Sequence, residues 1–274
     1  GSETDRWRAS SDWPFHAGLG LLGGVYAALI VAMLAADASF TTPAHLAKAL
    51  ASREIRYAIR LSLISCSLTA ILSLWVAVPL GFVLSRHRFW GRGLLDTLLD
   101  IPIVLPPLVL GLSLLILFQT FPGRLLERHL AVTYAVPGVV LAQFAVACAF
   151  AVRTMRVTFD QISPRSELVA LTLGCSRGQA FWLVTLPQAR RGLLTAATLA
   201  WARALGEFGP ILVFAGATRM KTEVLSTSVF LELSIGHLEA AVAVSLLMIV
   251  AAVVALLLVR WFGSEDAFGK AVEP

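Results

Sequence analysis

Two pairs of charged residues stand at helical spacing inside apolar sequence. Arg203 and Glu207 are four residues apart in one apolar run, and Asp96 and Asp100 have the same spacing at the start of another. Residues four apart share one face of a helix, so Arg203 can pair with Glu207. A single charge costs about 2.5 to 3.5 kcal/mol at the centre of a membrane, so the presence of this pair requires a reason.

Two interpretations of the Arg203–Glu207 pair stay open. A structural pair would lock its helix to the neighbouring helices, whereas a pair on a path would line or flank a route through the membrane near an inner gate. Gly209 stands beside the pair and allows its helix to kink or to pack closely. Pro106 belongs to the stretch PIVLPP, whose prolines remove backbone donors, so this stretch is expected to border a cavity. We therefore take Arg203, Glu207, Gly209 and Pro106 as candidates for a path or gate.

The other reactive side chains form no enzymatic pattern. Asp96 and Asp100 could hold a metal only with a matching acidic or histidine motif on another span, and none is found. Cys66, Cys148 and Cys175 have neither metal-binding nor redox spacing. With neither an HExxH nor a GxSxG motif recognised, neither catalytic residues nor a metal site are predicted. An intramembrane enzyme and a scaffold or sensor are kept as alternative classes.

Composition indicates which elements position these residues. Apolar residues make up 58% of the 274 residues and charged residues 14%, which is typical of a membrane protein. Six runs are long enough to cross a hydrocarbon core of about 30 Å, which takes roughly 20 helical residues. These runs are Ala17–Ala36, Leu61–Leu84, Leu98–Phe118, Tyr134–Val152, Gly192–Ala215 and Ala240–Val259. The sequence therefore predicts an all-α, polytopic membrane protein with about six transmembrane helices.

The placement of lysine and arginine predicts the orientation of the chain. These residues are more numerous in the segments that lie inside when the N-terminus is inside. Both termini and the loop 157–190 are therefore expected to face the cytoplasm. The net charge of +5 reflects the same bias and gives no reason to expect nucleic acid as a partner.

The loop contains an unusual stretch, TLGCSRGQAFWLVTLPQARRG, at residues 172–192. A first short helix is expected to start at Ser163 and to end or bend at Gly174, where glycine permits the left-handed conformation. A second is expected over Ser176–Trp182, with its aromatic residues exposed and with Pro187 stopping it. Such a helical pair cannot bury its apolar side alone, so it is expected to lie on the membrane surface or in a groove of a partner.

This stretch resembles the EAA loop of permease subunits in binding-protein-dependent ABC importers, through Gly174, Gln179, Phe181 and Pro187. In that family the loop forms coupling helices that insert into a groove of a cytoplasmic ATPase. The family's glutamate, six positions before the glycine, falls on Leu168 here, so the neighbouring Glu167 has to stand in. The resemblance implies ATPase-coupling roles for Glu167, Ala170, Gly174, Gln179, Phe181 and Pro187.

Two further stretches, RFWGRGLLDTLLDIPIVLPPLVLGLSLL from Arg88 and ARALGEFGPILVFAG from Ala202, resemble permeases of molybdate, tungstate and sulfate importers. The resemblance covers about Arg56 to Phe262. It implies a multi-pass, non-catalytic subunit of a bacterial or archaeal cell membrane that forms the path for an oxyanion. Ferric iron, polyamines and thiamine are alternative substrates. The implied organisation is an N-terminal tail over 1–16, a permease domain over 17–262 and a C-terminal tail over 263–274.

The resemblance also implies partners. These are a second permease copy in a homodimer, two ATPase subunits and an extracytoplasmic binding protein, with Arg219 and Lys221 as candidates for docking that protein. The nearest match to a phosphate loop is GATRMKT at 216–222, in which Met220 replaces the required second glycine. No cofactor is therefore expected on this chain, and ATP and Mg²⁺ are expected on the partner ATPase.

Overall fold

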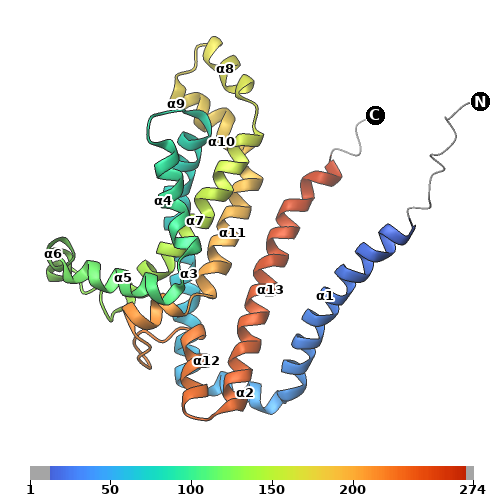
Figure 1. The fold of residues 1–274 in the computed structure, drawn as a ribbon, viewed down its shortest axis with the longest axis vertical. Helices are drawn as coiled ribbons and strands as arrows, with labels where there is room; N and C mark the ends of the chain where they lie inside the picture. The colour runs from blue at the N-terminus through green and yellow to red at the C-terminus, as the bar shows by residue number, and fades with distance from the viewer. Residues whose placement is uncertain (1–12, 270–274) are drawn as a thin grey trace, which may run out of the picture.

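The computed structural model describes residues 13–269, and all regular secondary structure in this part of the chain is helical (Figure 1). In chain order the helices are α1 (Trp13–Phe40), α2 (Pro43–Ala51), α3 (Arg53–Arg86), α4 (Arg92–Val104), α5 (Pro107–Gln119), α6 (Phe121–His129), α7 (Val136–Gln161), α8 (Pro164–Thr172), α9 (Arg177–Ala180), the π-helix η1 (Phe181–Thr185), α10 (Leu186–Gln188), α11 (Arg190–Leu205), the π-helix η2 (Ile211–Ala215), α12 (Leu225–Ser234) and α13 (Leu238–Gly269). The predicted all-α, polytopic fold is confirmed. The expected tails fall partly on residues 1–12 and 270–274, which lie outside the described residues.

The number of membrane-spanning helices differs from the six predicted runs. Four described helices are long and apolar enough to cross a membrane: α1, α3, α7 and α13. The helices α4 and α5 have 13 residues each, so only the pair is long enough to make a fifth span. The pair is bent by 114° at the break between them. The predicted run Leu98–Phe118 is thus broken, and the run Gly192–Ala215 is divided between α11 and η2. The sequence marked both interruptions, at the PIVLPP prolines and at Gly209, but each of the two runs was counted as one continuous span.

Prolines explain the break between α4 and α5. Leu105 adopts an extended conformation, with φ −64° and ψ 140°, because the residue before a proline disfavours the helical region. The second break, between α11 and η2, packs against the first. A Cβ added at Gly209 would lie 2.9 Å from Cβ of Pro107, and one added at Gly111 would lie 2.8 Å from Cα of Pro210. The two irregular segments therefore require glycine where their backbones meet.

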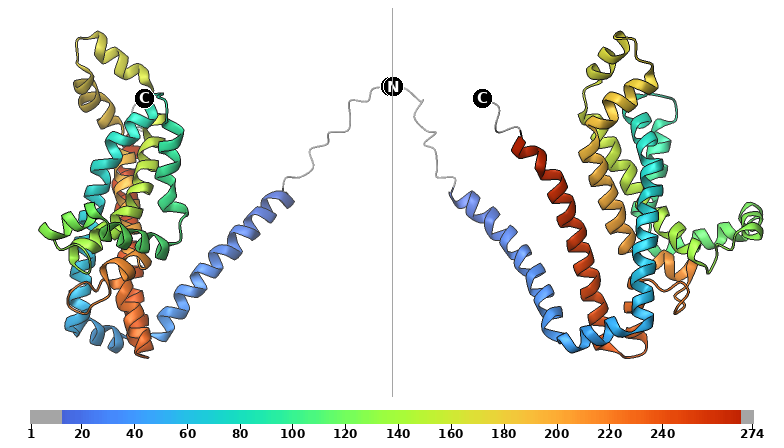
Figure 2. Two further views of the ribbon diagram at one scale, coloured as in Figure 1. Left: turned by 60° about the vertical axis from the view of Figure 1, so that its left-hand side comes forward. Right: turned by 180° about the vertical axis from the view of Figure 1, so that it is seen from behind.

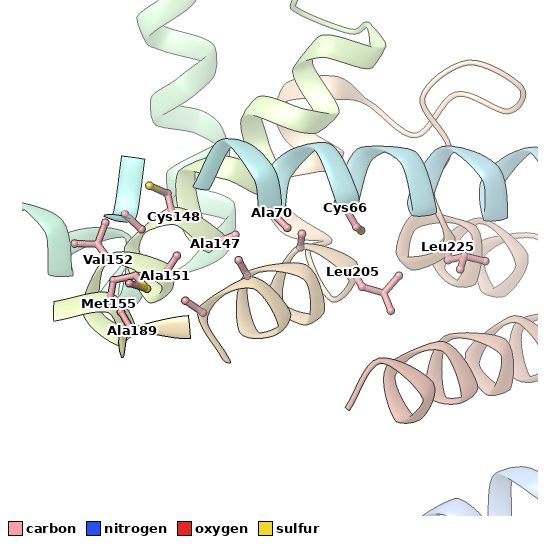
Figure 3. Packing of buried hydrophobic residues seen from close by; sticks show 14 of the residues in the cluster. Cys66, Ala70, Ala147, Cys148, Ala151, Val152, Met155, Ala189, Leu205 and Leu225 are labelled. Atoms are coloured by element: carbon pink, nitrogen blue, oxygen red, sulfur yellow. The ribbon is translucent and has the colours of Figure 1, made fainter. Parts of the chain in front are cut away.

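The centre of the fold is the contact among α3, α7 and α11 (Figure 3). Small residues let the helix backbones approach, as expected where lipid provides no hydrophobic drive between helices. A Cβ added at Gly81 of α3 would lie 2.9 Å from Cβ of Met155 and 2.9 Å from the backbone nitrogen of Arg156, both in α7. Polar contacts add to this packing, since Gln143 of α7 donates to the carbonyl of Ala204 at 3.2 Å. Thr69 of α3 in turn donates to the amide oxygen of Gln143 at 3.2 Å.

The helix α1 stands apart from this centre, as both views in Figure 2 show. None of its apolar window is buried within the chain, in contrast to 44% for α3 and 56% for α7. The described beginning of α1 and the end of α13 lie toward the same end of the molecule as α8 (Figure 1). The two described ends of the chain and the α8 segment therefore lie toward one end of the molecule.

Replacing Gly81 with valine should force α3 and α7 apart, because the new side chain meets the α7 backbone. Overpacking of this kind costs about 1 to 3 kcal/mol, so the unfolding temperature of the purified protein should fall. Gly93, in the first turn of α4, has no atom within 4 Å of an added Cβ. The control Gly93→Val should therefore leave the unfolding temperature nearly unchanged. Equal unfolding temperatures for the two variants would contradict the proposed role of Gly81.

Candidate functional site

The segment from α8 to α10 forms a helical loop that protrudes at one end of the molecule (Figure 1). Ser163 caps α8 as predicted, and its hydroxyl accepts a hydrogen bond from the Arg165 amide at 3.4 Å. The end of α8 is a Schellman motif, in which Cys175 donates to the Ala170 carbonyl and Gly174 to the Leu171 carbonyl, each at 3.1 Å. Gly174 has φ +95°, and an added Cβ would meet nothing within 4 Å. Conformation, not space, therefore requires glycine here.

The second half of the loop differs in part from the expected helix. Ser176 and Gln179 form a capping box, with Gln179 Oε1 accepting from the Ser176 amide at 2.8 Å and Ser176 Oγ accepting from the Gln179 amide at 3.3 Å. The helix α9 then widens into the π-helix η1 directly before Pro187. Proline lacks a donor and crowds the carbonyl four residues back, which accounts for the wider turn. Pro187 therefore does not stop the chain's helical course, because α10 includes it and α11 begins at Arg190.

The loop contains a GxSxG motif, so the expectation that the chain lacks this motif is wrong. The stretch GCSRG, from Gly174 to Gly178, matches the GxSxG spacing of hydrolase nucleophiles. That motif requires a sharp turn from a strand into a helix, which exposes the serine hydroxyl. Ser176 instead stands between two helices, and its hydroxyl caps α9. The structure therefore provides no nucleophile elbow here.

The two faces of the loop have different surroundings. Phe181 was expected to be exposed, but it packs inward against Phe82 of α3, with ring centroids 4.8 Å apart, and against Phe159 of α7 at 6.3 Å. Ala170 and Ala180 are buried on the same inner side. The outer side exposes large apolar residues, with Trp182 65% exposed. The other exposed large apolar residues on the loop are Leu168, Val169, Leu173 and Leu183.

The predicted pair of Arg203 and Glu207 is formed. Arg203 Nη2 lies 2.6 Å from Glu207 Oε1, with the side chain of Glu207 1% exposed and that of Arg203 30% exposed. The contact is an ion pair without the alignment of a hydrogen bond. Arg203 Cζ also lies 5.7 Å from the ring centroid of Phe150, at cation–π distance. Glu207 is thus enclosed, while Arg203 reaches toward an open surface.

A groove with a volume of about 640 Å³ lies between α7 and α11, and Phe150, over which Arg203 lies, is one of its lining residues. Phe150 lines its end nearest Arg203, and Gln161 and Gln188 line its end at the α8–α10 loop. Its lining also includes Arg153, Thr154, Thr158, Arg191, Thr195 and Leu199. Phe150 therefore connects the Arg203–Glu207 pair to a groove that reaches the loop. Gly209 packs against Pro107, next to Pro106, which is exposed.

The sequence did not identify partners for Asp96 and Asp100. Both carboxylates bind arginines of α7, with Asp96 Oδ1 2.5 Å from Arg156 Nη1 and Asp100 Oδ2 2.8 Å from Arg153 Nη2. The sequence did contain a signal for these ion pairs. Arg153 and Arg156 are three residues apart and share one helical face, as do the two aspartates four residues apart. Within residues 13–269 no group of histidine, cysteine and acidic side chains could hold a metal ion.

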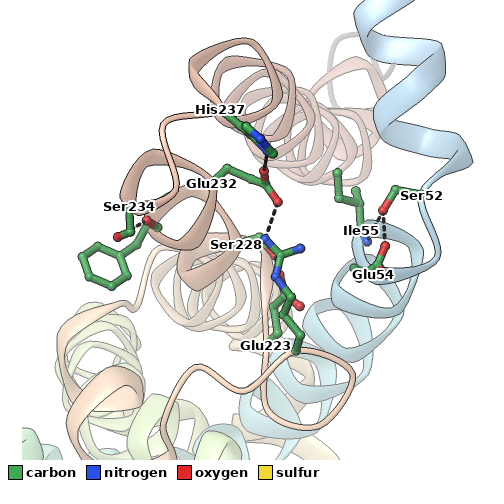
Figure 4. A network of polar contacts seen from close by, with 10 residues as sticks. Ser52, Glu54, Ile55, Glu223, Ser228, Glu232, Ser234 and His237 are labelled. Carbon is green, nitrogen blue, oxygen red and sulfur yellow. Dashed lines mark hydrogen bonds and ion pairs between the residues drawn. The ribbon is translucent and has the colours of Figure 1, made fainter.

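The docking candidates Arg219 and Lys221 lie at the opposite end of the molecule from α8. Arg219 Nη2 lies 2.7 Å from Glu232 Oε1, and His237 Nδ1 lies 3.2 Å from the other oxygen of Glu232 (Figure 4). The hydrogen bond to Glu232 raises the pKa of Arg219. Burial raises the pKa of the nearby Glu223, whose carboxylate accepts from the Ser228 hydroxyl at 2.7 Å. Arg219 is thus exposed but paired with the buried Glu232, whereas Lys221 is exposed without such an ion pair in the part of the chain that the structure describes.

Comparison with known proteins identifies the family. Residues 77–264 match the family described as "Binding-protein-dependent transport system inner membrane component". The sulfate transport system permease protein CysT of Escherichia coli K12 is 33% identical over 222 residues, which cover 80% of this chain and 79% of CysT. The molybdenum transport system permease protein ModB of Mycobacterium tuberculosis is 36% identical over 215 residues, covering 77% of this chain and 80% of ModB.

The fold is also shared with a solved transporter. A chain of the crystal structure of a bacterial alginate ABC transporter, in complex with an alginate pentasaccharide-bound periplasmic protein, aligns with a TM-score of 0.71 and 18% identity. The alignment covers 93% of this chain and 95% of that one. With the family match, this likeness leads to one conclusion: the chain belongs to the binding-protein-dependent transport system inner membrane components, as a multi-pass, non-catalytic ABC permease subunit.

Proposed function

We propose that this chain forms the membrane path of an importer for a tetrahedral oxyanion, namely sulfate, molybdate or tungstate. The observation that carries the proposal is the protruding loop from α8 to α10. Its inner side packs on α3 through Phe181, and its outer side exposes an apolar face. Large exposed apolar patches mark interaction sites. A helix pair with this character fits a groove of a separate ATPase, on which ATP and Mg²⁺ would be held. The permeases CysT and ModB support the substrate class through their sulfate and molybdenum transport.

The proposed assembly is a homodimer of this chain with two ATPase subunits and an extracytoplasmic binding protein. One chain offers an open groove between α7 and α11, so a second copy would complete an enclosed path. The permease domain would comprise residues 17–262, with 157–190 as the coupling segment. Lys221 would meet the binding protein directly, and Arg219 would shape that surface through its pairing with Glu232.

The roles proposed for the path candidates follow from their surroundings. Glu207 is enclosed and would hold Arg203, whose guanidinium lies over Phe150 at the end of the groove. Gly209 permits the close contact between the two broken segments beside Pro106. The positive charge of Arg203 would then attract the anion at the groove's end, although Glu207 neutralises part of it.

Replacing Gly174 with valine should reduce substrate-stimulated ATP hydrolysis, because a β-branched residue does not adopt φ +95° without strain. The loop would then end α8 differently and misplace its apolar face. The variant Gly174→Asn should keep more activity, since asparagine tolerates the left-handed conformation. Stimulated hydrolysis would be measured in the assembled transporter. Equal activity of the valine and asparagine variants would argue against a conformational role for Gly174.

For the Arg203–Glu207 pair, we expect Glu207→Gln to lower stability, because breaking a buried pair costs about 3 to 5 kcal/mol. The partial exposure of Arg203 should place the loss at the lower end of this range. The double variant Arg203→Gln with Glu207→Gln should recover stability but not uptake, since the positive charge at the groove is gone. Thermal unfolding and anion uptake would be measured on the single and double variants. Recovery of uptake in the double variant would instead assign the pair a structural role alone.

Reversing the charge of Lys221, by Lys221→Glu, should slow association with the loaded binding protein at low salt. Charges at the rim of an interface act mainly on the association rate and on its salt dependence. The substitution Lys48→Glu reverses the charge of a second exposed lysine, on α2 at the same end of the molecule, and would be compared with Lys221→Glu. Stopped-flow association at two salt concentrations would test the assignment. A rate that is unchanged by Lys221→Glu at low salt removes this residue from the docking surface.

A further inference from the structure

Arg86, the last residue of α3, joins three elements at the base of the loop. Its Nη2 donates to the carbonyl of Ile162 at 2.8 Å, and Ile162 caps the end of α7. Its Nε lies 3.7 Å from Oε2 of Glu167, in the first turn of α8. The two side chains are largely enclosed, with Arg86 12% and Glu167 19% exposed. One guanidinium therefore connects the end of α3, the end of α7 and the start of α8.

The contact lies where the direction of α8 is set. Only Ile162 and Ser163 separate α7 from α8, and both have extended conformations, with ψ of 124° and 128°. Two adjustable residues alone would leave the angle between the helices weakly defined. The charge of Arg86 holds Glu167 inward, so the next residues, Leu168 and Val169, face outward. The carboxylate in the first turn of α8 is also favoured by the helix dipole.

A second contact from the same turn of α3 supports the other half of the loop. Phe82 lies one helical turn before Arg86, and its ring centroid is 4.8 Å from that of Phe181 and 5.5 Å from that of Phe159. The last turn of α3 thus holds α8 by an ion pair and η1 by aromatic packing. The outer face of the loop has no comparable contact among the described residues.

We infer that Arg86 is the positioning residue of the coupling loop and that Glu167 acts through Arg86, inside this chain, instead of touching the ATPase. The inference rests on the proposed function for its consequence, because the orientation of α8 matters only if its outer face docks on a partner. It reassigns Glu167 from a docking contact to an internal anchor. The carboxylate of Glu167 then faces α3, and the exposed apolar residues of the loop provide the docking face.

A distance measurement on the permease alone tests the anchor without relying on transport. Spin labels would be placed on Thr172 of α8 and Val83 of α3, both exposed, after Cys175→Ser removes the partly exposed native thiol. Arg86→Gln and Glu167→Gln should each broaden the distribution of label distances. Arg88→Gln, two residues beyond the anchor on an exposed position, should leave it unchanged. A distribution that stays narrow in both anchor variants overturns the inference.

A double-mutant cycle in the assembled transporter tests the consequence for coupling, with sulfate and molybdate as probes. Each single variant should lower anion-stimulated ATP hydrolysis about fivefold or more, the scale of a typical coupling between sites. The double variant Arg86→Gln with Glu167→Gln should lose no more than the worse single variant, because both remove the same interaction. The exchanged pair, Arg86→Glu with Glu167→Arg, should regain part of the stimulation.

The outcomes separate this inference from the proposed function. Additive losses, or a loss with Glu167→Gln but none with Arg86→Gln, would mean that Glu167 contacts the ATPase and would overturn the inference. An unaltered chain that shows no stimulation with either anion would contradict the proposed function, and the distance measurement would still decide on the anchor. Each purified variant complex should contain the ATPase and the permease in the same ratio as the unaltered complex, which distinguishes altered coupling from failed assembly.

Discussion

The close approach of α3, α7 and α11 is the constraint on which the rest of the structure depends. In lipid, apolar side chains gain little by meeting one another, so helices associate where small residues allow backbone contact. Gly81 provides that contact between α3 and α7, and buried alanines provide it along α11. The α3–α7 contact at Gly81 immediately precedes the turn that carries Phe82 and Arg86. The packing at the centre therefore also fixes the place where the loop is attached.

Elements outside this centre are held by charge and by backbone fit. The helix α4 has no buried side chain, yet two carboxylates, Asp96 and Asp100, tie it to α7. Pairing removes the high cost of isolated charges near the membrane. Beyond the break, α5 is held by the contact of Gly111 with Pro210. The bent pair is therefore fixed at two points by two different interactions, which is how it keeps an angle that its apolar composition alone does not specify.

Composition was sufficient to predict a helical membrane protein, because burial in lipid requires long apolar runs and allows little else. It was not sufficient to locate the breaks, since Pro79 lies within α3 and Pro102 within α4 while Pro106 ends a helix. Whether proline bends or ends a helix depends on neighbours that are distant in sequence. The same limit applied to Phe181, whose exposure was predicted from local periodicity although Phe82 covers it.

The contrast between the two faces of the coupling loop explains how such a loop can serve a transporter. A loop that docks on a moving partner passes a displacement to the membrane only if its own attachment does not yield. Here the Schellman turn at Gly174 and the capping box at Ser176 fix the shape of the loop, while Phe181 and Glu167 attach it to α3. The apolar outer face lacks such ties within the described chain. Rigidity is thus concentrated on the membrane side of the loop, where a displacement has to be transmitted, and the opposite side is left to complement a partner.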